Sequence, residues 1–137
     1  MEIILDADVV IRGEKGSFEL SEWLASRVDD TFSVAAITVA ELWHGVERAD
    51  AARRPRRERY LRALVGALEI LPYTEQTAYT HARLWAELQG AGKMIGYYDV
   101  IVAATALEWG RPIATFNRRH FECARGLQII EPAVVSG

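Results

Sequence analysis

The sequence predicts an α/β fold in which a central, mostly parallel β-sheet is flanked by helices. The first observation is that short apolar segments alternate with longer segments of helical periodicity. The second is that Gly and Pro residues stand where those segments end, as at Pro72 and Gly110. The third is the composition, which is 50% hydrophobic and 26% charged and therefore suits a covered sheet with a solvated exterior.

The expected elements follow one another in a regular order. Strands are predicted at residues 2–5, 31–36, 69–71, 112–116 and 127–130. Helices are predicted at residues 17–28, 38–49, 74–89 and 98–109, and in the arginine-rich segment that follows a turn at Pro55. Gly110 stands where the helix over 98–109 needs a C-terminal cap.

Length and charge limit the classes of protein that need to be considered. With 137 residues, the chain is expected to form a single domain over 1–137. A net charge of −3 argues against binding nucleic acid by bulk charge alone. The single cysteine excludes an internal disulfide framework, and the amino-terminal residues do not resemble a signal peptide. We therefore expect a cytoplasmic protein without a membrane-spanning segment.

Oxygen-bearing side chains follow several of the predicted strands or begin the predicted helices. Asp6 and Asp8 follow the first strand, Glu41 follows the second, and Asn117 follows the strand over 112–116. Asp99 lies in the first turn of a helix that is apolar almost all round. Binding sites of such folds form beyond the carboxyl ends of the strands, so we expect these side chains to gather there.

Each of these residues also has a purely structural interpretation. Asp6 and Asn117 are suitable N-caps, and Asp99 would interact favourably with a helix dipole. Thr38 and Glu41 have the spacing of a capping box. Taken together, however, three carboxylates in one place repel one another unless a cation joins them or their pKa values rise. An all-oxygen set without Cys or His favours Mg²⁺ or Mn²⁺ over Zn²⁺.

Four motifs carry a family resemblance over almost the whole chain. They are ILDADVV at 4–10, TVAEL at 38–42, GYYDVIVAATAL at 96–107 and ATFNRRHF at 114–121. In this order and spacing the chain resembles PIN-domain proteins, and specifically the VapC toxins of toxin–antitoxin pairs. The resemblance implies a PIN-like fold and an RNA-cleaving endonuclease that uses Mg²⁺ or Mn²⁺.

The resemblance also implies roles for particular residues and partners. Asp6, Glu41 and Asp99 would form the catalytic and metal-binding acidic core. Asp8 and Asn117 depart from the pattern of many relatives and are weaker candidates for the metal site. Thr115, Arg118 and Arg119 are candidates for binding the substrate. The expected partners are RNA, a cognate antitoxin and a second copy of the chain in a two-fold dimer.

Two alternatives remain open at this point. A strand that ends in Asp-x-Asp is also the nucleophile motif of haloacid-dehalogenase-like phosphatases, in which Asp6 would be phosphorylated and Asp8 would act as acid and base. The chain offers only Lys15 and Lys93 for the lysine of that class, and no acidic pair follows Asp99. The second alternative is a catalytically impaired PIN-fold module that binds RNA or protein, which Asn117 suggests.

Overall fold

A computed structural model of the chain describes residues 1–133, and a five-stranded sheet lies at its centre. The strands are β1 (Glu2–Leu5), β2 (Thr31–Ala35), β3 (Glu69–Leu71), β4 (Ile113–Ala114) and β5 (Ile129–Ile130). Their order is β3-β2-β1-β4-β5, and every neighbouring pair is parallel. The predicted α/β class is therefore confirmed, and the sheet is parallel throughout.

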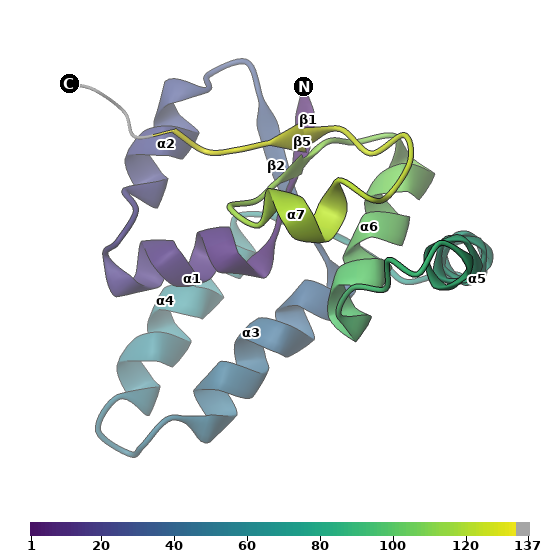
Figure 1. The fold of residues 1–137 in the computed structure, drawn as a ribbon. Coiled ribbons are helices and arrows are strands. Elements are labelled where there is room, and N and C mark those ends of the chain that lie inside the picture. The colour runs from purple at the N-terminus through teal and green to yellow at the C-terminus, as the bar shows by residue number, and fades with distance from the viewer. Residues whose placement is uncertain (134–137) are drawn as a thin grey trace.

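Helices cover both faces of this sheet (Figure 1). The helices α1 (Ala7–Lys15), α2 (Leu20–Ser26), α3 (Ala36–Arg48) and α4 (Arg54–Gly66) contribute to the core on one face. The helices α5 (Glu75–Gly90), α6 (Tyr97–Trp109) and α7 (Arg118–Phe121) contribute to the core on the other. Within residues 1–133, every helix is too short or too polar to cross a lipid bilayer.

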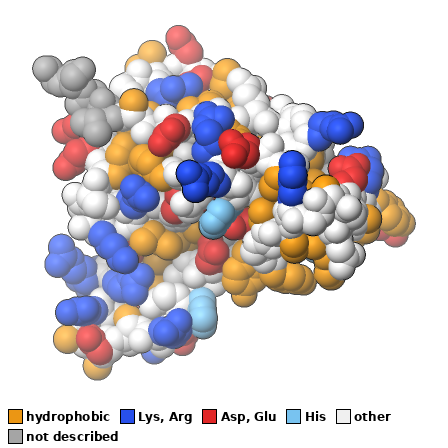
Figure 2. All heavy atoms as spheres, in the orientation of Figure 1, with side chains coloured by type: hydrophobic (Ala, Val, Ile, Leu, Met, Phe, Trp, Pro, Cys, Tyr) orange, Lys and Arg blue, Asp and Glu red, His pale blue; other side chains and the backbone are white. Residues whose placement is uncertain are grey.

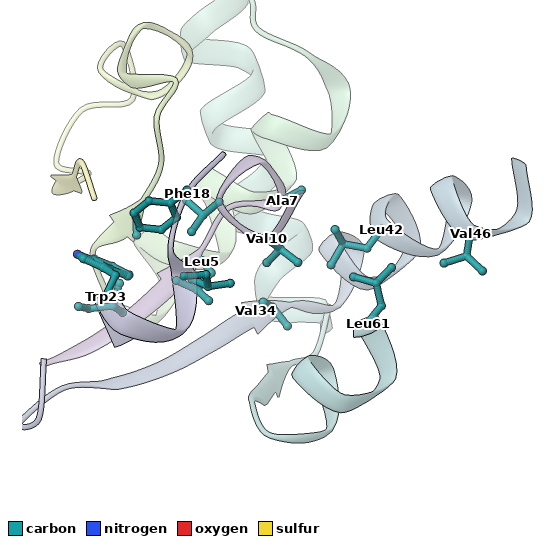
Figure 3. Packing of buried hydrophobic residues seen from close by; sticks show 13 residues of the cluster. Leu5, Ala7, Val10, Phe18, Trp23, Val34, Leu42, Val46 and Leu61 are labelled. Atoms are coloured by element: carbon teal, nitrogen blue, oxygen red, sulfur yellow. The ribbon is translucent and has the colours of Figure 1, made fainter. Parts of the chain in front are cut away.

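The side-chain alternation of β1 divides the core between the two faces. Ile3 and Leu5 pack with α1, α2 and α4, whereas Ile4 packs with α5 and α6, and all three are fully buried. Figure 3 shows the first of these clusters, where Leu5 and Val34 of the sheet lie beside Val10 of α1. Because both faces are buried, β1 is apolar without alternation from Ile3 to Leu5, which is the pattern that predicts a parallel sheet.

The sequence analysis did not predict helix α1. Gly13 lies inside it and lowers its helical propensity, which obscures the pattern. The glycine has a packing reason, because a Cβ atom there would come within 2.8 Å of Leu20 Cβ and 2.9 Å of Tyr60 Oη. The helix ends at Gly16, whose φ of 79° lies in the left-handed region that glycine adopts readily.

Several predicted boundaries were wrong. The helix expected over 17–28 is confined to α2, and α3 begins two residues earlier than expected. Ala35 is the N-cap of α3, so Thr38 and Glu41 lie inside the helix and do not form a capping box. The strands over 112–116 and 127–130 are each reduced to two residues. The cap at Gly110 is confirmed by its φ of 63°.

The strand order locates the crevice of the sheet. From β1 the chain proceeds outward through β2 and β3 on one side and through β4 and β5 on the other. The order therefore reverses between β1 and β4, which pair directly at Leu5 and Ala114. In open parallel sheets this reversal leaves room for a ligand beyond the carboxyl ends of the two strands.

Candidate acidic active site

The residues that follow β1 and β4 meet at this crevice. Asp6 directly follows β1, and its backbone N–H donates to the carbonyl of Ala114 in β4 at 3.0 Å. Asp8 lies in the first turn of α1, and Thr115 directly follows β4. Figure 2 shows carboxylates beside a histidine near the middle of the displayed face, with basic side chains on either side.

Asp6 has both a structural and an electrostatic role. Its Oδ1 accepts a hydrogen bond from the N–H of Ala7 at 2.9 Å, so it caps α1, and its Oδ2 accepts one from Thr115 Oγ1 at 2.8 Å. Only 4% of the residue is exposed. Burial and then the Asp8 and Asp99 charges raise the pKa of Asp6 to about 8, although the Thr115 hydrogen bond opposes the rise. Capping and participation in the acidic cluster therefore coexist.

Thr115 connects the residues beyond the two strands. Its fully buried hydroxyl donates to Asp6, lies 3.4 Å from both carboxylate oxygens of Asp8, and accepts from the N–H of Asn117 at 3.0 Å. The N–H of Phe116 donates to Asp8 Oδ2 at 2.9 Å. The hydroxyl thus orients a carboxylate instead of facing solvent. Asn117 stands at the N-cap position of α7, but its side chain makes no cap hydrogen bond.

Glu41 extends from α3 toward the same charges. It lies in the second turn of the helix and is partly buried. The pKa of Glu41 is raised by burial and by the charges of Asp99 and Asp8. Glu41 does not cap α3, because the helix begins five residues before it. What distinguishes Glu41 is its partial burial near the charges of Asp99 and Asp8.

Asp99 lies in the first turn of α6, at the edge of the cluster. Burial raises its pKa, the nearby His120 lowers it, and the charge of Asp8 raises it. Asp99 Oδ2 lies 3.0 Å from His120 Nδ1, a contact that the sequence analysis missed. No periodicity links residues 99 and 120, because their proximity depends on how α7 folds back toward α6.

These side chains suit a divalent cation by their chemistry. The donors are carboxylate oxygens, and each of Asp6, Glu41 and Asp99 has its pKa raised in part by the negative charge of its neighbours. Across residues 1–133, no three His, Cys, Asp or Glu side chains converge closely enough to form a complete metal-binding group. A divalent cation bound among these carboxylates would offset their shared negative charge.

The family relationship is decided by a match over most of the chain. The PIN domain family matches residues 3–126. The chain belongs to the PIN-domain family. A VapC ribonuclease, Y4jK of Sinorhizobium fredii, is 35% identical, covering 95% of this chain and 96% of the relative. A tRNA(fMet)-specific endonuclease VapC of Salmonella typhimurium is 32% identical, covering 70% of this chain and 71% of the relative.

A solved structure supports the same relationship. The chain resembles a chain of the DNA-bound VapBC structure from Salmonella typhimurium with a TM-score of 0.86 and 28% identity. The alignment covers 95% of this chain and 97% of that chain. Membership of the PIN-domain family confirms the resemblance found in the motifs. It also sets aside the haloacid-dehalogenase-like alternative for Asp6 and Asp8.

Basic residues of this PIN domain border the acidic cluster. Arg118 and Arg119 are exposed on α7, as is His120. Arg12, which was not among the predicted site residues, places its guanidinium 4.3 Å from the ring centroid of Phe116. The sequence could have indicated this position, since Arg12 follows Asp8 by four residues on α1 and therefore lies on the same helix face.

The arginine-rich helix α4 contributes partly to the fold. Arg57 lies 2.9 Å from Glu14 of α1 and donates to the carbonyl of Gly45 in α3 at 3.1 Å. Arg54 pairs with Glu47 at 2.9 Å. Arg57 therefore joins three helices, and only part of the basic run is available to a ligand.

Proposed function

We propose that this chain is the toxin of a toxin–antitoxin pair, a divalent-metal-dependent endoribonuclease that acts through Asp6, Glu41 and Asp99. The observation that carries the proposal is the set of three carboxylates with raised pKa values at the reversal point of a PIN-domain sheet. Relatives named as ribonucleases and as a tRNA-specific endonuclease support RNA as the substrate. We further propose that the domain extends over residues 1–137 and acts in the cytoplasm.

The chain's own residues would hold and orient the reacting groups. Asp6 is held by the N–H of Ala7 and the hydroxyl of Thr115, and Asp99 by His120, so the rotation of both carboxylates is restricted. Glu41 adds a third from α3. A divalent cation bound there, which we propose to be Mg²⁺ or Mn²⁺, would orient a water molecule and neutralise phosphate charge. Asp8 and Asn117 are weaker candidates for the same site.

The surroundings of the site suit a polyanion. Arg118 and Arg119 are exposed on α7 next to His120, which contacts Asp99, and they would offset the negative charge of the site toward an approaching phosphate. Thr115 would act through Asp6, because its hydroxyl is already committed to that carboxylate. These basic groups explain how a chain of net charge −3 would bind RNA.

An antitoxin is the proposed protein partner, because the chain also resembles a member of the VapBC family of toxin-antitoxin systems from Mycobacterium tuberculosis. A cavity of about 450 Å³ opens between α3 and α4, lined in part by Val39, Trp43 and Val65. We propose that an amphipathic antitoxin helix docks there. An antitoxin arginine placed against the acidic cluster would occupy the site of the cation. A two-fold homodimer is also proposed, and sedimentation analysis tests it.

The experiment that tests the function combines growth with cleavage. Expression of the chain alone should arrest growth, and co-expression of its antitoxin should restore it. Purified protein should cleave RNA with Mg²⁺ or Mn²⁺ and lose that activity in EDTA. A folded protein that binds Mn²⁺ and RNA but never cleaves would instead support the catalytically impaired binding module. Harmless expression with intact cleavage would remove only the toxin role.

A further inference from the structure

A cavity of about 780 Å³ lies between the α5–α6 connection and α7. Lys93 and Gly96 line it from the connection, and Arg119 and His120 line it from α7, together with Glu122 just beyond. Met94 and Ile95 of the connection and Cys123 beyond α7 complete its lining. Two separate segments of the chain thus form a hollow with basic groups on opposite walls.

The two cations that line this cavity, Lys93 and Arg119, are not held in ion pairs among residues 1–133. By contrast, the arginines at 54, 57 and 62 on α4 each pair with a glutamate. Glu122 is the acidic residue on the cavity wall, so the two cations exceed it by one charge. Such a cavity is suited to a single anionic group, because its cations are not already neutralised by the protein.

The cavity adjoins the acidic cluster directly. His120 lines it and also contacts Asp99 Oδ2 at 3.0 Å. Gly96 lines it as well, and a Cβ atom at that position would lie 3.4 Å from the same oxygen. A second cavity of about 440 Å³, which Asn117 and Arg118 help to line, shares Arg119, His120 and Glu122 with the first. The hollow surface is therefore continuous from the cluster across α7.

We propose that this cavity binds a backbone phosphate of single-stranded RNA next to the one that is cleaved, through Lys93 and Arg119. The inference rests on the proposed function, because a strand held at the acidic cluster must place its neighbouring phosphate beside it. Lys93 supplies a compact ammonium and Arg119 a planar guanidinium with several donors, so together they bind phosphate oxygens from two walls. The cavity thereby sets the direction in which the strand leaves the cluster.

The test compares two double variants that lose the same charge. K93A/R119A removes the cavity cations, and R56A/R59A removes two exposed arginines of α4 that do not line the cavity. Binding of a fluorescent single-stranded RNA is measured by anisotropy between 50 and 200 mM salt (roughly the range in which such contacts are lost). The measurement is made in a D99N background, and cleavage by each double variant is measured with Asp99 intact.

The cavity variant should bind RNA about tenfold more weakly at low salt, and the slope of log K against log salt should become shallower by about 0.7, the value for one phosphate contact on a single strand. The α4 variant should change both quantities much less. Equal losses of RNA affinity in the two double variants would overturn the proposal that the cavity binds a phosphate. An unaltered slope of log K against log salt in K93A/R119A would overturn it as well. If the unaltered chain does not cleave RNA, the proposed nuclease function is refuted instead. The binding measurement does not depend on cleavage and still tests the cavity.

Discussion

Protons and divalent cations should compete for Asp6. With a pKa of about 8, its carboxyl is protonated near neutral pH, and a metal ion must displace that proton to bind. The ionised fraction is about 1% at pH 6 and about 10% at pH 7, so Mn²⁺ affinity should rise about tenfold, or 1.4 kcal/mol, over that unit. The raised pKa values of Glu41 and Asp99 act in the same direction.

Titration calorimetry provides the assay. Mn²⁺ is titrated at pH 6.0 and 7.0 (roughly two units and one unit below the Asp6 pKa) in pairs of buffers whose ionisation enthalpies differ. The difference in heat between paired buffers gives the number of protons released, which should be close to one or higher. D50N is a matched control, since Asp50 is exposed and lies at the far end of α3. A dissociation constant that stays flat, with no proton release, would refute the reasoning.

The same shift makes a prediction for stability without metal. The folded protein holds the Asp6 proton up to about pH 8, whereas the unfolded chain loses it near 3.8. The folded state therefore binds more protons between these values, and stability must fall as the pH rises through that window, by up to about 6 kcal/mol. Asp6→Asn keeps the cap on α1 and removes this loss. Its advantage in melting temperature should be large at pH 8 and absent near pH 4.

Three substitutions test the other ligands. Asp99→Asn should abolish nearly all cleavage while the melting temperature holds or rises, because carboxylate repulsion is relieved; unfolding of this variant would show a structural role instead. Glu41→Gln should reduce kcat by more than the roughly 10- to 100-fold typical of an outer-shell change, with unchanged circular dichroism, and near-normal turnover would remove Glu41 from the site. Asn117→Asp should tighten Mn²⁺ binding if the side chain faces the cation, whereas identical calorimetric titrations would exclude it.

The fold was predictable where the hydrophobic pattern was strong. The strand at Glu2–Leu5 and the helix that ends at Gly110 follow from continuous apolar runs and a glycine cap. Helix α1 was not predicted because it contains Gly13, a poor helix former. The glycine is needed for close packing against Leu20, a residue outside the helix. The start of α3 was misplaced because Thr38 imitates a cap, although it is fully buried. In each case tertiary packing overrode a local signal.

The candidate site was predictable in its residues more than in its contacts. Asp6 and Asp8 follow a strand, and this local position already placed them at the edge of the sheet. The contact between Asp99 and His120 was not predictable, since it depends on the path of the chain between α6 and α7. The place of Lys93 in the cavity was likewise not predictable, because it depends on the α5–α6 connection lying beside α7.

The most direct measurement is a crystal structure of the protein soaked with Mn²⁺, using anomalous scattering to locate the ion. A peak is expected within about 2 Å of carboxylate oxygens of Asp6 and Asp99, with Glu41 on the same ion directly or through water. The peak should vanish in Asp99→Asn under the same soak. A fully occupied Mn²⁺ elsewhere on the chain, in a protein that cleaves RNA, would contradict the acidic site proposed for this PIN domain.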